Sequence, residues 1–220
     1  MDVKVRSADA AAVGVKVWSV NLDRPGMPGW SSLSTAECRR ALRFADPLER
    51  RRWVVARSTL KRLLGELTGV PAARLAIRAD PGGRPSVDGL DFNLSHSGQW
   101  ALIAVAPEGQ RVGVDVERIS AETGFMELAA RMYQPEEAER VRTAGAPEFF
   151  RLWTAKEAFV KATGIGLAGL RDTEVTREGS AALVGSRSRA ERWPVRWLDV
   201  APGYAAALVT TSWTPAPRTG

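Results

Sequence analysis

Two carboxylates lie two residues apart in the apolar segment 112–117, and they are the residues best placed for chemistry. Side chains alternate between the two faces of a β-strand, so Asp115 and Glu117 would project from one face while Val114 and Val116 take the other. Hard oxygen ligands of this kind hold magnesium, which commonly bridges one or two carboxylates to substrate phosphates. The segment therefore predicts a strand with one packing face and one binding face.

A third carboxylate and a lysine come from segment 153–161, whose periodicity is typical of a helix. Trp153, Glu157 and Lys161 are spaced four apart and share one stripe of that helix. Taken alone, Glu157 and Lys161 are explained by a solvent-exposed ion pair, which contributes about 0.3–0.5 kcal/mol. Beside Asp115 and Glu117, the same two residues favour a magnesium-assisted phosphate site.

Segment 93–98 holds the only histidine of the chain, His96, between Ser95 and Ser97. Two interpretations remain open. The segment ends a strand and turns sharply, which would offer amides, hydroxyls and an imidazole to a phosphate. Alternatively, the two serines cap a following helical turn and His96 is bonded internally. A Ser-His-Asp hydrolase is disfavoured because the chain contains no Gly-x-Ser-x-Gly motif.

The basic residues point to an anionic partner without choosing one. The 31 Lys and Arg exceed the 25 Asp and Glu, which gives a net charge of +6. Arg52, Arg57 and Arg84 could each form a forked contact with phosphate. Because the charges are scattered, nucleic acid is only a secondary hypothesis.

Length and composition indicate a soluble protein. The chain has 220 residues, 45% of them hydrophobic, enough for one large domain or two small ones. It shows no uninterrupted apolar stretch of membrane-spanning length and no signal-peptide pattern, so we expect an intracellular protein without membrane contact. The single Cys38 fits a reducing compartment and makes thiol catalysis a poor candidate.

Periodicity and turn residues predict an α+β protein. Ser34 with Glu37 forms a capping box, and Asp46 followed by Pro47 marks the start of a long helix. We expect helices over 34–44, 46–67, 122–131, 135–143 and 147–163, and strands over 13–17, 75–79, 90–94, 99–106, 111–117, 195–200 and 204–211, with others near Val175 and Leu183. The order strand, helix, strands recurs in each half and suggests two lobes, 1–107 and 108–220.

The blocks at 83–85, 92–97, 112–117 and 153–161, taken together, resemble the Sfp-type 4′-phosphopantetheinyl transferase family in order and separation. The match covers roughly residues 52–167. It implies transfer of the phosphopantetheine arm of coenzyme A to a serine of an acyl or peptidyl carrier protein, with release of 3′,5′-adenosine bisphosphate. It also implies two pseudo-symmetric lobes, each a small, mostly antiparallel sheet packed against a long helix, with the site between them.

The resemblance assigns roles to particular residues. Asp115, Glu117 and Glu157 would hold Mg²⁺, or Mn²⁺, on the coenzyme A pyrophosphate, and Lys161 would neutralise charge during the reaction. Glu157 is also a candidate base for the serine proton, with Glu136 or a metal-bound water as alternatives. The implied coenzyme A contacts are Arg52 and His96 on the 3′-phosphate, and Ser95, Gly83, Arg84 and Pro85 near the pyrophosphate and adenine. Arg84 stands where relatives more usually carry lysine.

Family precedent and chain length favour a cytoplasmic monomer, and the resemblance also implies a place in secondary-metabolite biosynthesis. Coenzyme A and an apo carrier protein are the expected partners. One alternative is a non-catalytic protein of the same fold that binds coenzyme A or a carrier protein. The acidic set argues against it, because three carboxylates beside an anionic ligand repel that ligand unless a metal intervenes.

Overall fold

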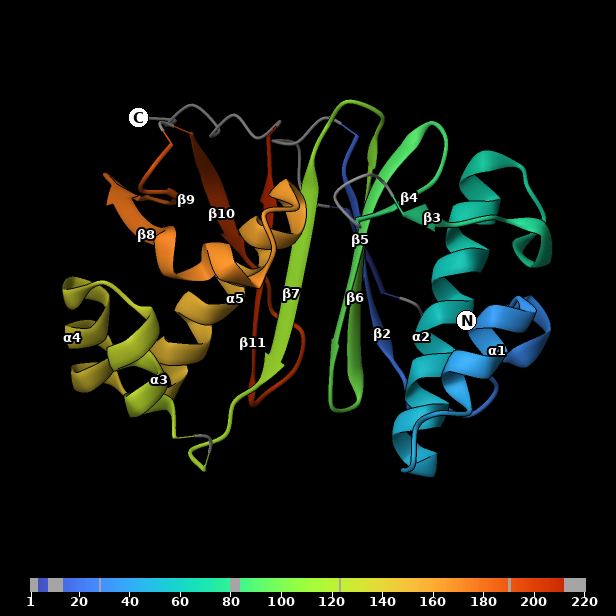
Figure 1. Ribbon diagram of the computed structural model, residues 1–220, viewed down its shortest axis with the longest axis horizontal. Helices are drawn as coiled ribbons and strands as arrows, with labels where there is room; N and C mark the ends of the chain where they lie inside the picture. The colour runs from blue at the N-terminus through green and yellow to red at the C-terminus, as the bar shows by residue number, and fades with distance from the viewer. Residues whose placement is uncertain are drawn as a thin grey trace.

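The computed structural model describes residues 4–7, 14–27, 29–79, 84–122, 124–189 and 191–211, with residues 4–7 described by their backbone alone. Figure 1 shows the elements. In chain order they are β1 (Lys4–Ser7), β2 (Lys16–Asn21), η1 (Trp30–Ser32), α1 (Thr35–Ala41), α2 (Pro47–Thr68), η2 (Ala72–Arg74), β3 (Arg78–Ala79), β4 (Pro85–Ser86), β5 (Leu90–Ser97), β6 (Trp100–Pro107), β7 (Val112–Arg118), α3 (Phe125–Met132), α4 (Pro135–Ala144), α5 (Ala146–Thr163), η3 (Leu167–Asp172), β8 (Thr173–Glu178), β9 (Ala181–Ser186), β10 (Arg192–Trp197) and β11 (Tyr204–Thr210).

Two antiparallel sheets carry the site. The first has the strand order β1-β2-β6-β5, and the second has the order β7-β11-β10-β9-β8. The edge strands β5 and β7 lie next to each other, where the two sheets meet (Figure 1). The predicted α+β class with mostly antiparallel sheets is therefore confirmed.

Three apolar clusters hold the layers together. The long helix α2 packs on the outer face of the first sheet, with Leu60 and Leu64 against Phe92 and Ile103. The helix α5 packs on the second sheet in the same way, through residues such as Phe159. Between the sheets lies a third cluster, to which strands of both contribute. Figure 1 shows the resulting order of helix, sheet, sheet and helix.

The helix boundaries follow from local sequence chemistry. The capping box predicted at α1 is present, because the Ser34 hydroxyl accepts the Glu37 N–H and the Glu37 carboxylate accepts the Ser34 N–H. Asp46 caps α2 by accepting the Leu48 N–H at 2.8 Å, ahead of Pro47. The helix α5 ends at Gly164, which adopts the left-handed conformation with φ of 74°. The predicted starts of α1 and α2 and the predicted end of α5 are confirmed.

Several strand predictions were wrong in their bounds. The strand expected over 90–94 continues to Ser97, and the one expected over 75–79 shrinks to the two residues of β3. The first predicted strand, over 13–17, lies instead at Lys16–Asn21, with Val13 outside the described residues. The centre of β2 is buried on both faces, between α2 and the second sheet, so apolar and polar residues do not alternate along it. The strand β1 was not predicted.

The division of the chain at residue 107 into two lobes stays a prediction, although β6 ends at Pro107 and β7 begins at Val112. In the part of the chain that the structure covers, no helix is both long enough and apolar enough to span a membrane.

Candidate active site

The strand β7 presents its two carboxylates as the alternation predicts. Val114 and Val116 are fully buried in the cluster between the sheets, whereas Asp115 and Glu117 lie on the opposite face. Asp115 is only 1% exposed, and Glu117 is partly buried. A carboxylate as buried as Asp115 needs a compensating partner, because desolvation of an isolated charge is costly.

The helix α5 supplies that partner because it lies unusually close to β7. A Cβ atom at Gly113 would overlap the carbonyl oxygen of Ala158 and approach the side chain of Ala162. Glycine at position 113 therefore lets the helix lie directly against the strand. Glu157 and Lys161, one turn apart on α5, are brought beside Asp115 as a result.

A compact cluster of polar groups forms at this contact. Lys161 Nζ lies 2.6 Å from Asp115 Oδ1, 3.2 Å from Ser95 Oγ and 3.9 Å from Glu157 Oε2. The Ser95 hydroxyl donates to the same Asp115 oxygen at 2.6 Å. Three elements, β5, β7 and α5, thus converge on one carboxylate.

The serines lie on a strand, which corrects the helix-capping interpretation of segment 93–98. Ser95, His96 and Ser97 belong to β5, and the strand ends in a turn at residues 98–99, as the other interpretation expected. A phosphate contact there stays a prediction. Ser97 Oγ accepts the Arg118 N–H at 3.1 Å, and a hydrogen bond from Ser97 favours the ionised form of Glu117. Each carboxylate of β7 therefore receives a hydrogen bond from one serine of β5: Asp115 from Ser95, and Glu117 from Ser97.

Burial and mutual repulsion raise the pKa values of two of the carboxylates, Glu117 and Glu157. Burial raises the pKa of Glu117 to about 7, with repulsion from Asp115 and Glu157 acting in the same direction. Burial also raises the pKa of Glu157, where the Asp115 charge adds to the effect and Lys161 opposes it. The Asp115 charge thus acts on both Glu117 and Glu157.

The residues fit a divalent cation chemically, although they are not pre-assembled as a metal site. Asp115 Oδ2 is a buried carboxylate oxygen with no hydrogen-bond partner among the described residues. Within the same residues, no group of three His, Cys, Asp or Glu side chains stands ready to hold a metal ion. Lys161 instead places its ammonium group between Asp115 and Glu157. The shared metal ion stays a prediction.

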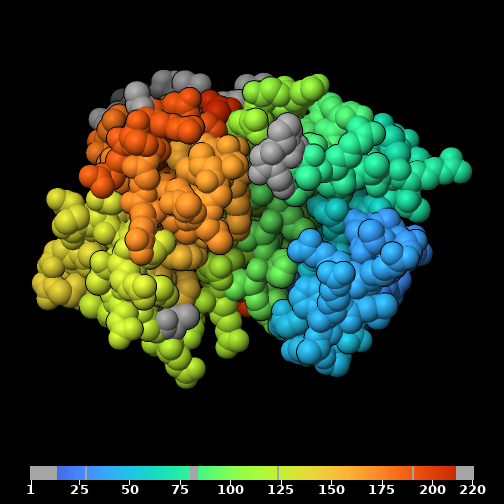
Figure 2. Space-filling view, in the orientation of Figure 1, coloured from blue at the N-terminus to red at the C-terminus, as the bar shows by residue number. Residues whose placement is uncertain are grey.

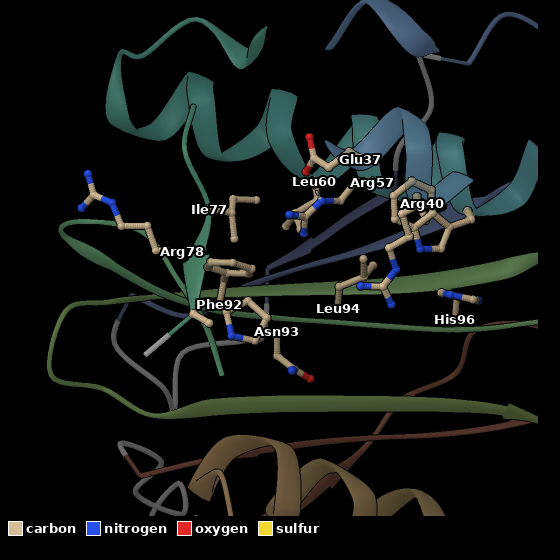
Figure 3. A pocket seen from close by; sticks show the side chains of 14 residues that line it. Glu37, Arg40, Arg57, Leu60, Ile77, Arg78, Phe92, Asn93, Leu94 and His96 are labelled. Atoms are coloured by element: carbon tan, nitrogen blue, oxygen red, sulfur yellow. Dashed lines mark hydrogen bonds and ion pairs between the residues drawn. The ribbon is translucent and has the colours of Figure 1, made fainter. Parts of the chain in front are cut away.

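A basic pocket of about 430 Å³ lies beside the cluster, between α2 and the outer face of β5. Figure 3 shows its lining side chains, and Figure 2 shows the surface hollowed between α1–α2 and α3–α5, with green atoms of the central strands at its floor. The lining residues are Glu37, Arg40, Trp53, Ala56, Arg57, Leu60, Ile77, Arg78, Ala79, Pro85, Phe92, Asn93, Leu94 and His96. The combination of aromatic, apolar and cationic side chains suits a nucleotide-like anion.

His96 and Arg40 lie at one end of this pocket (Figure 3). The His96 side chain is exposed at the pocket, yet partial burial lowers its pKa, with the Glu49 charge opposing this effect and the Lys161 charge adding to it. The Arg40 guanidinium stands 5.7 Å from the ring centroid of Trp53, within cation–π range. Arg40 was missed by the sequence reasoning, because nothing in the spacing of α1 indicates which of its arginines faces α2.

Two arginines predicted to bind phosphate are engaged within the protein. Arg52 forms a forked contact with Asp23, at 2.9 and 2.6 Å, and contacts Glu49 at 2.9 Å. Arg57 pairs with Glu37. Of these acidic partners, Glu37 also lines the pocket, and the pairs hold both guanidinium groups in place.

Arg84 also lies inside the protein, where it pairs with Asp91 and is 7% exposed. Its guanidinium donates to backbone carbonyls of the protein, and the predicted contact of Arg84 with coenzyme A stays a prediction. Pro85 lines the pocket, whereas Gly83 lies outside the described residues. Glu136, the alternative base, is exposed at the start of α4.

Comparison with known proteins adds the decisive observation. A family model described as the 4′-phosphopantetheinyl transferase superfamily matches residues 111–209. The 4′-phosphopantetheinyl transferase HetI of Nostoc sp. is 36% identical over 174 residues, which cover 73% of this chain and 73% of HetI. The chain belongs to the 4′-phosphopantetheinyl transferase superfamily. The predicted resemblance is confirmed.

More distant members align over much of this transferase as well. The 4′-phosphopantetheinyl transferase Sfp of Bacillus subtilis is 26% identical over 216 residues, covering 88% of this chain and 91% of Sfp. A second 4′-phosphopantetheinyl transferase of Bacillus subtilis is 25% identical over 166 residues, 70% of this chain and 72% of that relative. The region matched by the family model contains β7 and α5, the elements that carry Asp115, Glu117, Glu157 and Lys161.

Proposed function

We propose that this transferase moves the 4′-phosphopantetheine arm of coenzyme A to a serine hydroxyl of an apo acyl or peptidyl carrier protein, in a magnesium-dependent reaction that releases 3′,5′-adenosine bisphosphate. Family membership supports the group that is transferred. One observation of geometry supports the reaction centre: Asp115, Glu157, Lys161 and Ser95 meet at one point beside a basic pocket.

The pocket would take the nucleotide end of coenzyme A. Arg40 and His96 stand at its mouth, where they could contact the 3′-phosphate, and Phe92 and Ile77 offer apolar surface inside. The pyrophosphate would then lie toward Ser95 and Lys161, which point to the same side of β5 as Asp115. A cationic lysine beside the pyrophosphate stabilises the charge that develops on the leaving group.

Asp115, Glu117 and Glu157 would hold the divalent cation, and Mn²⁺ suits the same oxygen ligands as Mg²⁺. When bound there, the cation supplies charge neutralisation for the pyrophosphate. The orphaned Asp115 Oδ2 and the raised pKa values of Glu117 and Glu157 support this assignment, since all three features are relieved by a positive charge.

In the reaction the carrier serine oxygen forms a bond to the phosphorus that bears the pantetheine arm, and the bond from that phosphorus to the bridging pyrophosphate oxygen breaks. Glu157 is the candidate base for the serine proton, because its carboxylate lies beside Lys161 and Asp115 at the proposed reaction centre. The bridging oxygen leaves with 3′,5′-adenosine bisphosphate.

The proposal is tested by incubating the protein with coenzyme A, MgCl₂ and apo carrier proteins and measuring the intact mass of each carrier. We expect a mass gain equal to the phosphopantetheine arm, absent when the carrier serine is alanine and absent in EDTA. Unchanged mass across a panel of acyl and peptidyl carrier proteins would contradict the proposal. The same panel distinguishes a transferase from a protein that only binds coenzyme A.

A further inference from the structure

Arg84 lies buried at the contact between the two sheets, just before β4. Its side chain is 7% exposed and forms a two-pronged pair with Asp91 of β5, which is itself 12% exposed. Pulling the guanidinium away to meet a ligand would leave the Asp91 charge buried without its partner, an arrangement that proteins avoid. The pair is therefore a fixed part of the fold.

The same guanidinium also contacts α5 and β7, the two elements that carry Asp115, Glu117 and Glu157. Its Nε donates to the Lys161 carbonyl oxygen at 3.1 Å, and Nη2 donates to the Val112 carbonyl oxygen at 2.8 Å. The Lys161 carbonyl is among the last four of α5, which have no partner within the helix, and a positive charge there is favourable. Arg84 thus binds the end of α5 and the start of β7 at once.

Asp91 completes the arrangement by accepting the Val112 N–H at 3.1 Å, so the pair engages both backbone polar groups of Val112. Further along the strands, Asn93 Oδ1 accepts the Val114 N–H at 3.0 Å and Ser97 Oγ accepts the Arg118 N–H at 3.1 Å. Side chains at alternate positions of β5 therefore bind the free edge of β7. The Arg84–Asp91 pair lies at one end of this row of hydrogen bonds. Ser95 is the exception in the row, because its hydroxyl donates to the Asp115 side chain.

We infer that Arg84 is a positioning residue, which fixes α5 and β7 relative to β5 and so sets the distance between Lys161 and Asp115; it is not a contact for coenzyme A. The inference rests on the proposed function only where it concerns turnover. Arginine suits this role better than lysine because one planar guanidinium can serve the carboxylate and two carbonyls together.

The test compares Arg84→Met and Arg84→Lys with wild type. Three quantities are measured: coenzyme A affinity by calorimetry without divalent cation, kcat and KM for transfer, and amide hydrogen exchange in the last turn of α5. For Arg84→Met we expect coenzyme A affinity within about threefold of wild type, kcat lower by roughly 30-fold or more, and exchange faster by about tenfold. Arg84→Lys should recover part of kcat, since it keeps the charge but not the fork.

Arg142→Met is the matched control, because Arg142 also forms a two-pronged pair, with Glu139, but on the exposed surface of α4. It should leave all three quantities unchanged. Should Arg84→Met fail to fold, Asp91→Asn can replace it, because it keeps the side-chain volume. We expect the same result from Asp91→Asn: a lower kcat with nearly unchanged affinity for coenzyme A.

Coenzyme A affinity that falls tenfold or more in Arg84→Met, with kcat and exchange unchanged, would overturn the inference and make Arg84 a ligand. If the wild-type protein transfers nothing to any carrier, the proposed function fails by itself. In that case the affinity and exchange measurements still decide the role of Arg84, because neither depends on turnover.

Discussion

Lys161 and Asp115 form an ion pair of 2.6 Å between α5 and β7, on the same Asp115 oxygen that receives the Ser95 hydroxyl. The ammonium group therefore stands where a cation would neutralise the carboxylates. The other oxygen, Asp115 Oδ2, has no hydrogen-bond partner in the described part of the chain. In this arrangement a divalent cation, as proposed above, would compete with Lys161 for Asp115.

Replacing Lys161 tests this competition. Lys161→Met should lower the free energy of unfolding of the metal-free protein by about 1–3 kcal/mol, since Asp115 loses its buried partner while Lys161 itself is partly exposed. The same variant should bind Mn²⁺ more tightly, by roughly threefold to tenfold, because a like charge is removed from the site. Thermal unfolding and calorimetry measure the two effects, with the exposed Lys16→Met as control. Weaker Mn²⁺ binding in Lys161→Met would contradict the competition.

The close approach of α5 to β7 predicts that Gly113 cannot be enlarged. Gly113→Ala would place a Cβ against the Ala158 carbonyl, so the helix must shift and carry Glu157 and Lys161 away from Asp115. We expect a loss of about 2–4 kcal/mol of unfolding free energy and of most transfer activity. Gly29→Ala is the matched control because a Cβ there meets nothing within 4 Å. Equal stability of the two variants would show that α5 does not depend on this contact.

Glu117 predicts an unusual pH dependence of stability. Its pKa of about 7 lies above the usual value of 4.5, so the folded protein keeps this proton over a range in which the unfolded chain has released it. The free energy of unfolding of metal-free protein should therefore fall as pH rises from about 4.5 to 7, by about 1–3 kcal/mol from this group. Glu117→Gln should remove that fall, which chemical denaturation in EDTA at several pH values would show. A slope that is the same in both proteins would exclude Glu117 as its cause.

The fold could be predicted from sequence wherever a local signal was sufficient. The capping box at Ser34, the Asp46-Pro47 start of α2 and the Gly164 end of α5 each depend on a few neighbouring residues, and each is confirmed. Strand ends depend on pairing between distant segments. The strand β5 continues through Ser97 because it pairs with β6 up to Trp100, which no local pattern indicates.

In the candidate site too, features that depend on local spacing could be predicted, and features that depend on packing could not. The alternation of Asp115 and Glu117, and the helical spacing of Glu157 and Lys161, correctly predicted the strand face and the helix face on which these side chains lie. The partners of the arginines could not be predicted, because the pairing of Arg84 with Asp91 and of Arg52 with Asp23 depends on how the segments pack. One signal was present but unused: Asp91, Asn93, Ser95 and Ser97 alternate along β5, which is the pattern of a strand that binds a neighbouring edge.

We expect Arg40 to contribute to the affinity of the pocket for coenzyme A. Its charge at the pocket mouth should contribute one contact to an anionic ligand, so Arg40→Met should weaken coenzyme A binding by roughly tenfold, as expected for a hydrogen bond to a charged group. Arg39→Met is the control, since Arg39 is exposed on α1 and does not line the pocket. Calorimetry with coenzyme A and with its 3′-dephospho form checks the contact. If Arg40→Met weakens the binding of both ligands equally, Arg40 does not contact the 3′-phosphate.

Glu157→Gln tests the central claim most directly, because it preserves shape while it removes the charge that we propose as metal ligand and base. The measurement is the intact mass of an apo carrier protein after a single turnover, with coenzyme A binding followed in parallel. We predict coenzyme A affinity within about threefold of wild type and transfer slowed by at least about a hundredfold. Transfer at the wild-type rate in Glu157→Gln would contradict the proposed reaction centre.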